Sequence, residues 1–206
     1  MGEVLEPVVA GGPGVAEAHG PPPMDIEIVP RKGLPFVALA VAFVIYAIAS
    51  NSHWALMFAH VAGGGMWTAV DVYVGLILGP ILGRLSLPAR VEFSARFMPK
   101  MVLLMPTVVM MTLASGFQIA MDFGNLFPTS VNRTWLVVSM VVVGIMAVVA
   151  LGLLEPANIG VLFEMRKPRP DGEVIDLLMK RFVYTAGITG VMQIATLIIM
   201  TRVATQ

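Results

Sequence analysis

The chain has 206 residues, of which 57% are hydrophobic and 13% are charged, and its mean hydropathy is +0.85. This composition is too apolar for a water-soluble domain and indicates an integral membrane protein. Thirteen basic and thirteen acidic residues balance each other, so we expect no nucleic-acid partner, and the absence of cysteine excludes disulfides, thiolate metal sites and iron–sulfur clusters.

The N-terminal segment 1–30 differs from the rest of the chain. It contains no Lys or Arg and five acidic residues, which are Glu3, Glu6, Glu17, Asp25 and Glu27. A polar, proline-rich segment of one charge sign cannot bury enough apolar surface to fold, so we expect a disordered acidic tail. Residues 31–206 then form the membrane domain.

Five apolar runs follow the tail, and each has the length of a membrane span. Their ranges are 34–50, 54–83, 101–121, 134–154 and 182–201. About 20 apolar residues cross the ~30 Å hydrocarbon layer, and backbone groups in lipid must bond within a helix. The sequence therefore predicts an all-α bundle of five transmembrane helices. The alternative has four, with the first run lying in the membrane interface.

Helical structure is also expected at the ends of these runs. Ser86 is the candidate N-cap of a helix that carries the i,i+4 pair Glu92 and Arg96, and Asp171 is the candidate cap of another. The fourth run continues beyond residue 154. Pro156 predicts a kink there, because proline removes a backbone donor and clashes with the preceding turn.

The basic residues predict how the chain is oriented. Eleven of the thirteen lie before the first run or in the connections that follow the second and fourth runs. Because Lys and Arg are concentrated in cytoplasmic loops, we expect the N-terminus in the cytoplasm and the C-terminus outside, in a multi-pass protein of the cell membrane. In the four-span alternative, Arg31 and Lys32 would lie outside, so nine basic residues would be cytoplasmic and four would be outside. The larger asymmetry favours five spans.

Titratable residues inside apolar helices are the first candidates for function, because each costs a few kcal/mol to bury in lipid. They are His53, His60, Asp71 and Glu155. Asp71 and Glu155 come at similar depths, ~18 Å and ~14 Å from one end of their helices by helical rise. Together with Asn158 they predict a proton or metal-ion pathway. The alternative is that each side chain only hydrogen-bonds a neighbour.

The two histidines share one helical face but lie seven residues apart. A separation of ~10.5 Å along the axis prevents them from binding one iron from opposite sides. His53 is expected to be a solvated histidine at the interface, with metal ligation as the alternative. His60 either makes a structural hydrogen bond or binds a haem or metal whose other ligand comes from another helix or subunit.

A glycine triplet follows one turn after His60. Gly63 and Gly64 allow a flat cofactor or another backbone to approach closely, and Trp67 continues the face that carries His60. Helix packing is the competing explanation. A repeated GxxxG pattern of the kind used in helix packing follows at Gly75, Gly79 and Gly83.

Sixteen methionines are many for this length, and several crowd the third run, including Met105 and Met110. Most are expected to fill irregular gaps between helices. Thioethers also bind haem iron and Cu(I), so copper is the alternative metal.

Two segments carry a resemblance to a known group of proteins. They read HWALMFAHVAGGGMW and, after a basic stretch, RFMPKMVLLMPTVVMMTLASG, within residues 53–116. The shared pattern is a helix with His60 and a Gly/Trp patch, followed by a helix with Pro106 in its first half and Gly116 near its end. This resembles the small membrane families that include the HemJ-type protoporphyrinogen oxidase and the CopD-like copper-resistance domains.

The resemblance implies b-type haem with His60 as an axial ligand and redox chemistry linked to quinone. Met105, Met110 or a second copy of His60 would complete the iron. One departure is that the run 134–154 has no Lys, Arg or His, whereas the resemblance to the HemJ-like proteins implies a basic residue in a later helix. This departure counts against the oxidase activity itself.

Three functions from different classes therefore fit the sequence. The first is a membrane redox protein that binds b-type haem. The second is a non-catalytic accessory subunit of a larger membrane complex, and the third is a pathway for protons or metal ions. The expected partners are the lipid bilayer, other membrane subunits or further copies of this chain, and quinone.

Overall fold

The computed structural model describes residues 27–205, and every regular element in this range is helical. Five helical stretches are long and apolar enough to cross a membrane, which confirms the five-span prediction. They are Arg31–Ala49, His53–Arg84, Leu87–Asp122, Arg133–Met165 and Gly172–Ala204. The chain is a multi-pass membrane protein. Nearly all of the expected tail 1–30 lies outside the described residues.

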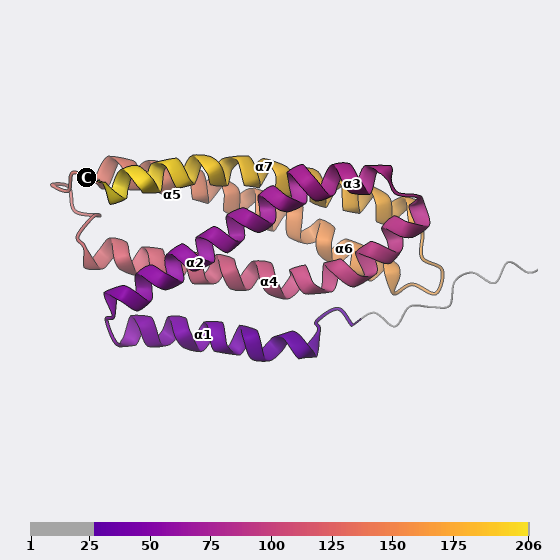
Figure 1. Ribbon diagram of the computed structural model, residues 1–206, viewed down its shortest axis with the longest axis horizontal. Helices are drawn as coiled ribbons and strands as arrows, with labels where there is room; N and C mark the ends of the chain where they lie inside the picture. The colour runs from indigo at the N-terminus through magenta and orange to yellow at the C-terminus, as the bar shows by residue number, and fades with distance from the viewer. Residues whose placement is uncertain (1–26, 206) are drawn as a thin grey trace, which may run out of the picture.

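The first, third and fifth spans are simple helices. A short 3-10 turn, η1 (Arg31–Gly33), leads into α1 (Leu34–Ala49), and the other two spans are α4 (Leu87–Asp122) and α7 (Gly172–Ala204). In Figure 1, α1 lies at one edge of the bundle, below α4 and away from α7.

The second and fourth spans each contain a π-helical segment. The second consists of α2 (His53–Val72), η2 (Tyr73–Leu78) and α3 (Gly79–Arg84). The fourth consists of α5 (Arg133–Val149), η3 (Ala150–Leu154) and α6 (Glu155–Met165). Figure 1 shows α2 crossing the bundle diagonally, from α1 towards α7.

Each π-helical segment ends immediately before a turn that contains a proline, Pro80 in α3 and Pro156 in α6. Proline has no N–H, and its ring clashes with the carbonyl four residues earlier. The wider π turn, with its i to i+5 spacing, relieves that clash without ending the helix. A kink is expected at Pro156. The structure has a π-helical segment just before this residue, and the span continues through it.

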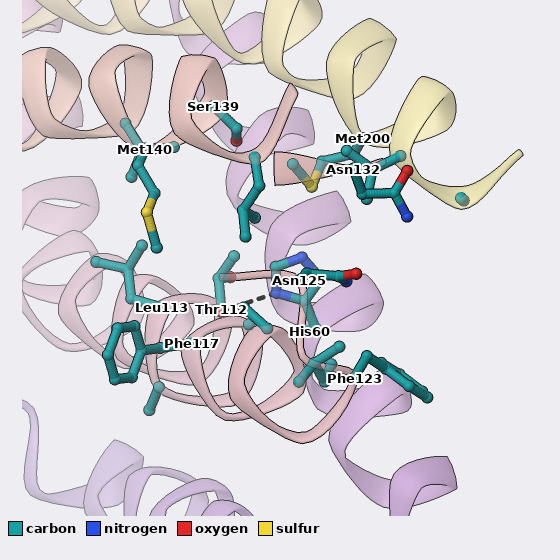
Figure 2. A pocket seen from close by; sticks show the side chains of 18 of the residues that line it. His60, Thr112, Leu113, Phe117, Phe123, Asn125, Asn132, Ser139, Met140 and Met200 are labelled. Atoms are coloured by element: carbon teal, nitrogen blue, oxygen red, sulfur yellow. Dashed lines mark hydrogen bonds between the residues drawn. The ribbon is translucent and has the colours of Figure 1, made fainter. Parts of the chain in front are cut away.

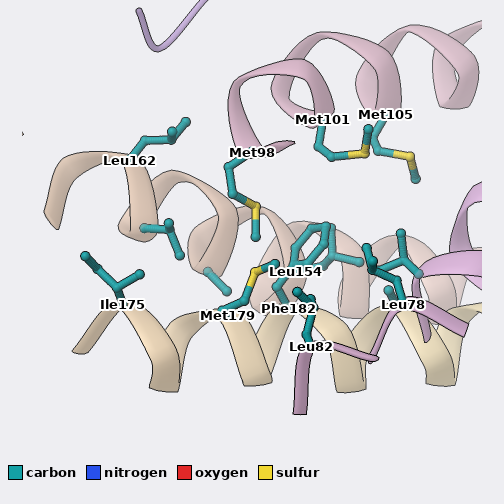
Figure 3. Packing of buried hydrophobic residues seen from close by; sticks show 14 of the residues in the cluster. Leu78, Leu82, Met98, Met101, Met105, Leu154, Leu162, Ile175, Met179 and Phe182 are labelled. Atoms are coloured by element: carbon teal, nitrogen blue, oxygen red, sulfur yellow. The ribbon is translucent and has the colours of Figure 1, made fainter. Parts of the chain in front are cut away.

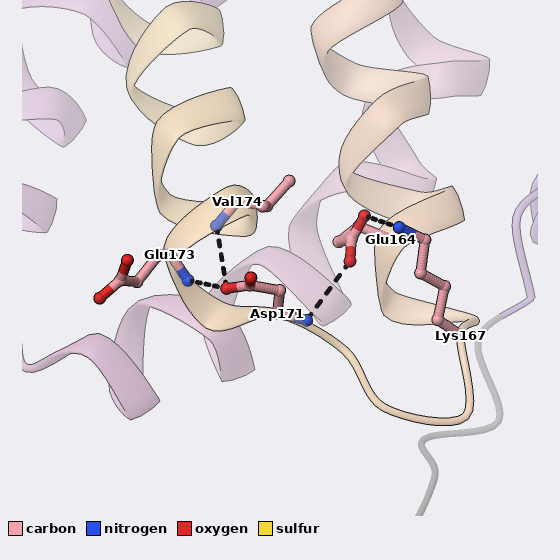
Figure 4. A network of polar contacts seen from close by, with 5 residues as sticks. All are labelled: Glu164, Lys167, Asp171, Glu173 and Val174. Carbon is pink, nitrogen blue, oxygen red and sulfur yellow. Dashed lines mark hydrogen bonds and ion pairs between the residues drawn. The ribbon is translucent and has the colours of Figure 1, made fainter.

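The predicted loop helices are the first turns of α4 and α7, so they continue the spans. Ser86 precedes α4, although its side chain makes no capping bond, and the Glu92–Arg96 pair forms at 2.7 Å. The Asp171 carboxylate accepts from the first backbone N–H groups of α7, as predicted (Figure 4). Glu164 accepts from the Lys167 ammonium at 2.6 Å and from the Asp171 N–H, which ties the α6–α7 connection to α6.

Methionines dominate the core between α4, α6 and α7. Met98, Met101 and Met105 on α4 are buried, and Figure 3 shows them facing Met179 and Phe182 of α7. Flexible thioether side chains fill the uneven spaces between helices that cross at an angle. The expected packing role of methionine is confirmed at these positions.

Glycines bring α7 close to the second span. A Cβ on Gly75 would lie 2.2 Å from the Cα of Gly187, and one on Gly79 would lie 2.5 Å from Val183 Cγ1. The GxxxG pattern therefore packs helices at its first two positions. Its third glycine, Gly83, has no heavy atom of the described residues within 4 Å of a Cβ placed on it, beyond its own turn.

The α3–α4 and α6–α7 connections lie at one end of the bundle, with the start of η1 on the same side (Figure 1). We call this the basic end, because it carries eleven of the thirteen Lys and Arg residues. They are Arg31, Lys32, Arg84, Arg90, Arg96, Lys100, Arg166, Lys167, Arg169, Lys180 and Arg181.

Candidate functional site

A cavity of about 1000 Å³ lies in the half of the bundle away from the basic end. Its walls come from α2, α4, α5, α7 and the α4–α5 loop, and most of the lining is aliphatic or aromatic. The residues that carry polar or sulfur atoms in this lining are His60, Thr112, Asn125, Asn132, Ser139, Met57, Met140 and Met200 (Figure 2).

His60 is the one titratable side chain in that lining. Its Nδ1 atom lies 2.9 Å from the backbone carbonyl oxygen of Thr112 on α4. A carbonyl oxygen can only accept a hydrogen bond, so Nδ1 carries the proton and donates it. In the neutral imidazole, this contact leaves the Nε2 atom with the lone pair that can bind a metal.

Glycines on both helices create the space for this contact. A Cβ on Gly63 would lie 2.8 Å from the Thr112 hydroxyl, so this glycine lets α2 approach α4 one turn after His60. A Cβ on Gly116 would lie 2.5 Å from both Cε1 and Nδ1 of the imidazole. Gly63 and Gly64 thus pack against α4, while Gly116 opens the surface on which the ring rests.

The structure separates His60 from several residues expected to act with it. Met105 is buried in the methionine core and does not line the cavity. It lies seven residues from Thr112, about 10 Å along α4. Trp67 is also buried in that core, two turns further along α2 than His60. The thioethers that line the cavity belong instead to Met57, Met140 and Met200.

His53 lies outside the cavity, at the start of α2. Its side chain is 59% exposed, its Nε2 atom lies 3.9 Å from an Asp122 carboxylate oxygen, and its ring packs against Phe123. Within residues 27–205, no group of three or more His, Cys, Asp or Glu side chains is arranged to hold a metal ion. A metal at His60 would therefore take its other ligands from thioethers or side-chain oxygens of the cavity lining, or from outside the described residues.

Asp71 lies in a separate polar region between α2 and α7. Its carboxylate faces Thr189 and Trp67, it is almost completely buried, and its Oδ2 atom has no hydrogen-bond partner among the described residues. One turn earlier, the Thr68 hydroxyl donates to the side-chain oxygen of Gln193 at 3.3 Å. These polar groups line up along the α2–α7 contact.

Glu155 and Asn158 both lie on α6. Asn158 is fully buried, and its amide faces the Glu155 carboxylate, which lies one turn earlier on the same helix. No hydrogen bond or ion pair of the described residues joins Asp71 to Glu155. The structure thus brings Asp71 together with α7, through residues that the sequence did not single out.

The missed cavity residues have weak sequence signals. Met57 lies three residues before His60, so helical spacing alone places it on the same face. Asn132 and Ser139 are seven residues apart, and the same spacing rule places them on one face of the following helix. The Thr112 carbonyl has no such signal, because every residue has a carbonyl.

Comparison with known proteins adds no assignment: no family model, no curated protein and no solved structure matches this chain.

Proposed function

We propose that this protein is a membrane redox protein that binds b-type haem in the His60 cavity, with Nε2 of His60 as an axial ligand. The observation that carries the proposal is the Nδ1 hydrogen bond to the Thr112 carbonyl. Histidines that bind metals commonly donate their other ring N–H to a carbonyl or carboxylate, which fixes the tautomer and the ring orientation.

The cavity suits a large, flat and mostly apolar ligand. Its volume of about 1000 Å³ is at the upper end of ligand pockets in general, and its walls are largely hydrocarbon. A thioether of Met140 on α5 or Met200 on α7 would hold the iron together with His60, and the amides of Asn125 and Asn132 would hydrogen-bond the haem carboxylates. The same thioethers would suit Cu(I), the alternative metal.

Bound haem would supply one-electron transfer through its iron, and the protein would tune it. His60 would bind the iron, the apolar walls would exclude water, and a methionine ligand would raise the reduction potential. Quinone is the proposed electron partner, because it dissolves in the bilayer that surrounds the helices.

A visible spectrum tests the haem proposal directly. We expect the full-length protein, purified in detergent from haem-replete cells, to show a Soret band that His60→Ala abolishes or strongly reduces. His53→Ala is the matched control, because it removes the same side chain from the same helix outside the cavity, and its band should remain. A wild type without a Soret band, or an undiminished band in His60→Ala, would contradict the proposal.

The accessory-subunit alternative makes a different prediction for the same preparation. A colourless protein that co-purifies in fixed ratio with another membrane chain would favour that role.

Proton or ion conduction is a second candidate, favoured by the buried Asp71 carboxylate with its unpartnered oxygen. In liposomes that contain the protein and an internal pH dye, an imposed pH gradient should decay faster than in empty liposomes. Asp71→Asn should slow that decay several-fold. Asp122→Asn, which removes a carboxylate at the end of α4 and away from the α2–α7 contact, should leave it unchanged. Equal rates for the wild type and Asp71→Asn would exclude the route.

We further propose that the basic end faces the cytoplasm and that the protein resides in the cell membrane. The support is the excess of Lys and Arg at this end, which is the usual feature of cytoplasmic loops.

A further inference from the structure

A second hollow lies between the second span and α7, near the basic end. It is an open groove of about 750 Å³, and its walls come from η2, α3 and one face of α7. One end is polar, with Arg90, Asp176 and Lys180 in the lining, whereas the rest is mostly hydrocarbon and glycine. The groove therefore changes from charged to apolar along its length.

The close helix contact explains why the groove exists. Gly75 meets the backbone of Gly187 directly, so at this level no side chain stands between the two helices. The neighbouring side chains of Leu76, Tyr184 and Ile188 are each more than half exposed and form the rims. The floor is thus backbone, and the open side faces the surroundings of the bundle.

The polar end of the groove carries an excess of positive charge. Arg90 and Lys180 both pair with Asp176, so two cations share one carboxylate. The Arg90 Nε atom is buried and has no hydrogen-bond partner in the described structure, and the Lys180 side chain is 56% exposed. One positive charge is left over, and the exposed Lys180 ammonium can reach a ligand in the groove, whereas the buried Nε atom of Arg90 cannot.

From these features we propose that the groove binds one phospholipid with an anionic headgroup. The phosphate would lie at Arg90 and Lys180, with the Tyr184 hydroxyl one turn further along α7, and an acyl chain would follow the glycine floor. Basic pockets between transmembrane helices are a recognised type of site for acidic lipids.

The length of the groove fits this occupant. The lining on α7 runs from Asp176 to Met192, and from Lys180, where the phosphate would lie, to Met192 the helix rises by about 18 Å. One leaflet of the hydrocarbon layer is about 15 Å thick, half of the whole. A single acyl chain would therefore be covered along its whole depth.

Lipid titration of the purified full-length protein, followed by native mass spectrometry, tests the proposal. Phosphatidylglycerol should bind at least about fivefold more tightly than phosphatidylcholine with the same acyl chains, the size expected for one basic residue near an acidic headgroup. Equal affinity for the two lipids would overturn the proposal without reference to any variant.

Two variants locate the site on the groove. Lys180→Gln should remove most of the preference for phosphatidylglycerol while the Arg90–Asp176 pair remains to support the fold. Lys167→Gln, at the same end but paired with Glu164 outside the groove, should keep the preference. A preference that survives Lys180→Gln, or that Lys167→Gln removes equally, would overturn the proposal.

Gly83→Leu provides the steric test. A Cβ at this position meets no described atom outside its own turn within 4 Å, so the larger side chain should enter the groove without disturbing the helices. Binding of phosphatidylglycerol should weaken at least about fivefold. Gly65→Leu, in a similarly open position outside the groove, should have no effect. Unchanged binding in Gly83→Leu would overturn the proposal.

Discussion

At the scale of single residues, the imidazole of His60 occupies the space that a side chain at position 116 would need. The ring lies against the bare backbone of Gly116 while its Nδ1 atom donates to the Thr112 carbonyl. One glycine on α4 therefore fixes the position of a histidine on α2. The haem proposal depends on this arrangement, because it aligns the free Nε2 atom.

Gly116→Ala should displace the His60 ring and weaken haem binding. The added Cβ would come within 2.5 Å of the imidazole, far inside normal contact, so the ring would be pushed towards the cavity and away from the Thr112 carbonyl. We expect a reduced or shifted Soret band and a loss of about 1–3 kcal/mol in stability from overpacking.

Gly144→Ala is the control for this substitution. It lines the same cavity, but its added Cβ meets no described atom within 4 Å beyond its own turn. Its spectrum should match that of the wild type, and its melting temperature should be the same or slightly higher, because alanine favours helix more than glycine does. Identical behaviour of the two alanine variants would show that Gly116 does not position His60.

At the scale of helices, prolines and glycines determine how the second span meets α7. The π-helical segment before Pro80 widens the turn, and Gly75 within that segment lies directly against Gly187. A widened turn and a missing side chain thus fall at the same crossing. The two helices pack closely at Asp71, on one side of this crossing. The lipid groove begins at the crossing itself, where Gly75 and Gly187 form part of its lining.

The GxxxG pattern offers a comparison within one membrane span. Gly75→Ala should lower the melting temperature, because its Cβ would lie 2.2 Å from the Gly187 Cα and backbone cannot move aside as a flexible side chain can. Overpacking of this kind costs about 1–3 kcal/mol. Gly83→Ala meets open space, so it should be neutral or gain up to about 1 kcal/mol from better helix propensity. A similar melting temperature for both variants would contradict the packing at Gly75.

At the scale of the whole molecule, the membrane spans were predictable because they depend on local properties. A run such as 182–201 shows its length and apolarity directly, and the Asp171 cap is visible from its residue type and place. The contact between His60 and Thr112 joins residues 52 positions apart, so it depends on how α2 crosses α4. The same reason explains why Met105 was a reasonable ligand candidate, although packing places it in the core.

The orientation of the molecule is the property on which both proposed sites depend. If the basic end faces the cytoplasm, the His60 cavity opens towards the outer leaflet and the lipid groove lies in the inner one. The reverse orientation would exchange these leaflets, and with them the side from which an electron partner reaches the cavity. The orientation proposal rests on the distribution of Lys and Arg, because helix packing alone is compatible with either direction.

Single cysteines decide the orientation cleanly, because the chain has no native cysteine. Thr129→Cys lies in the α4–α5 loop and Arg169→Cys in the α6–α7 connection, and both positions are exposed. In intact cells, a membrane-impermeant maleimide should label residue 129 and spare residue 169 until the membrane is permeabilised. Labelling at residue 169 with protection at residue 129 would reverse the orientation. That result would place the proposed lipid in the outer leaflet and the His60 cavity on the cytoplasmic side.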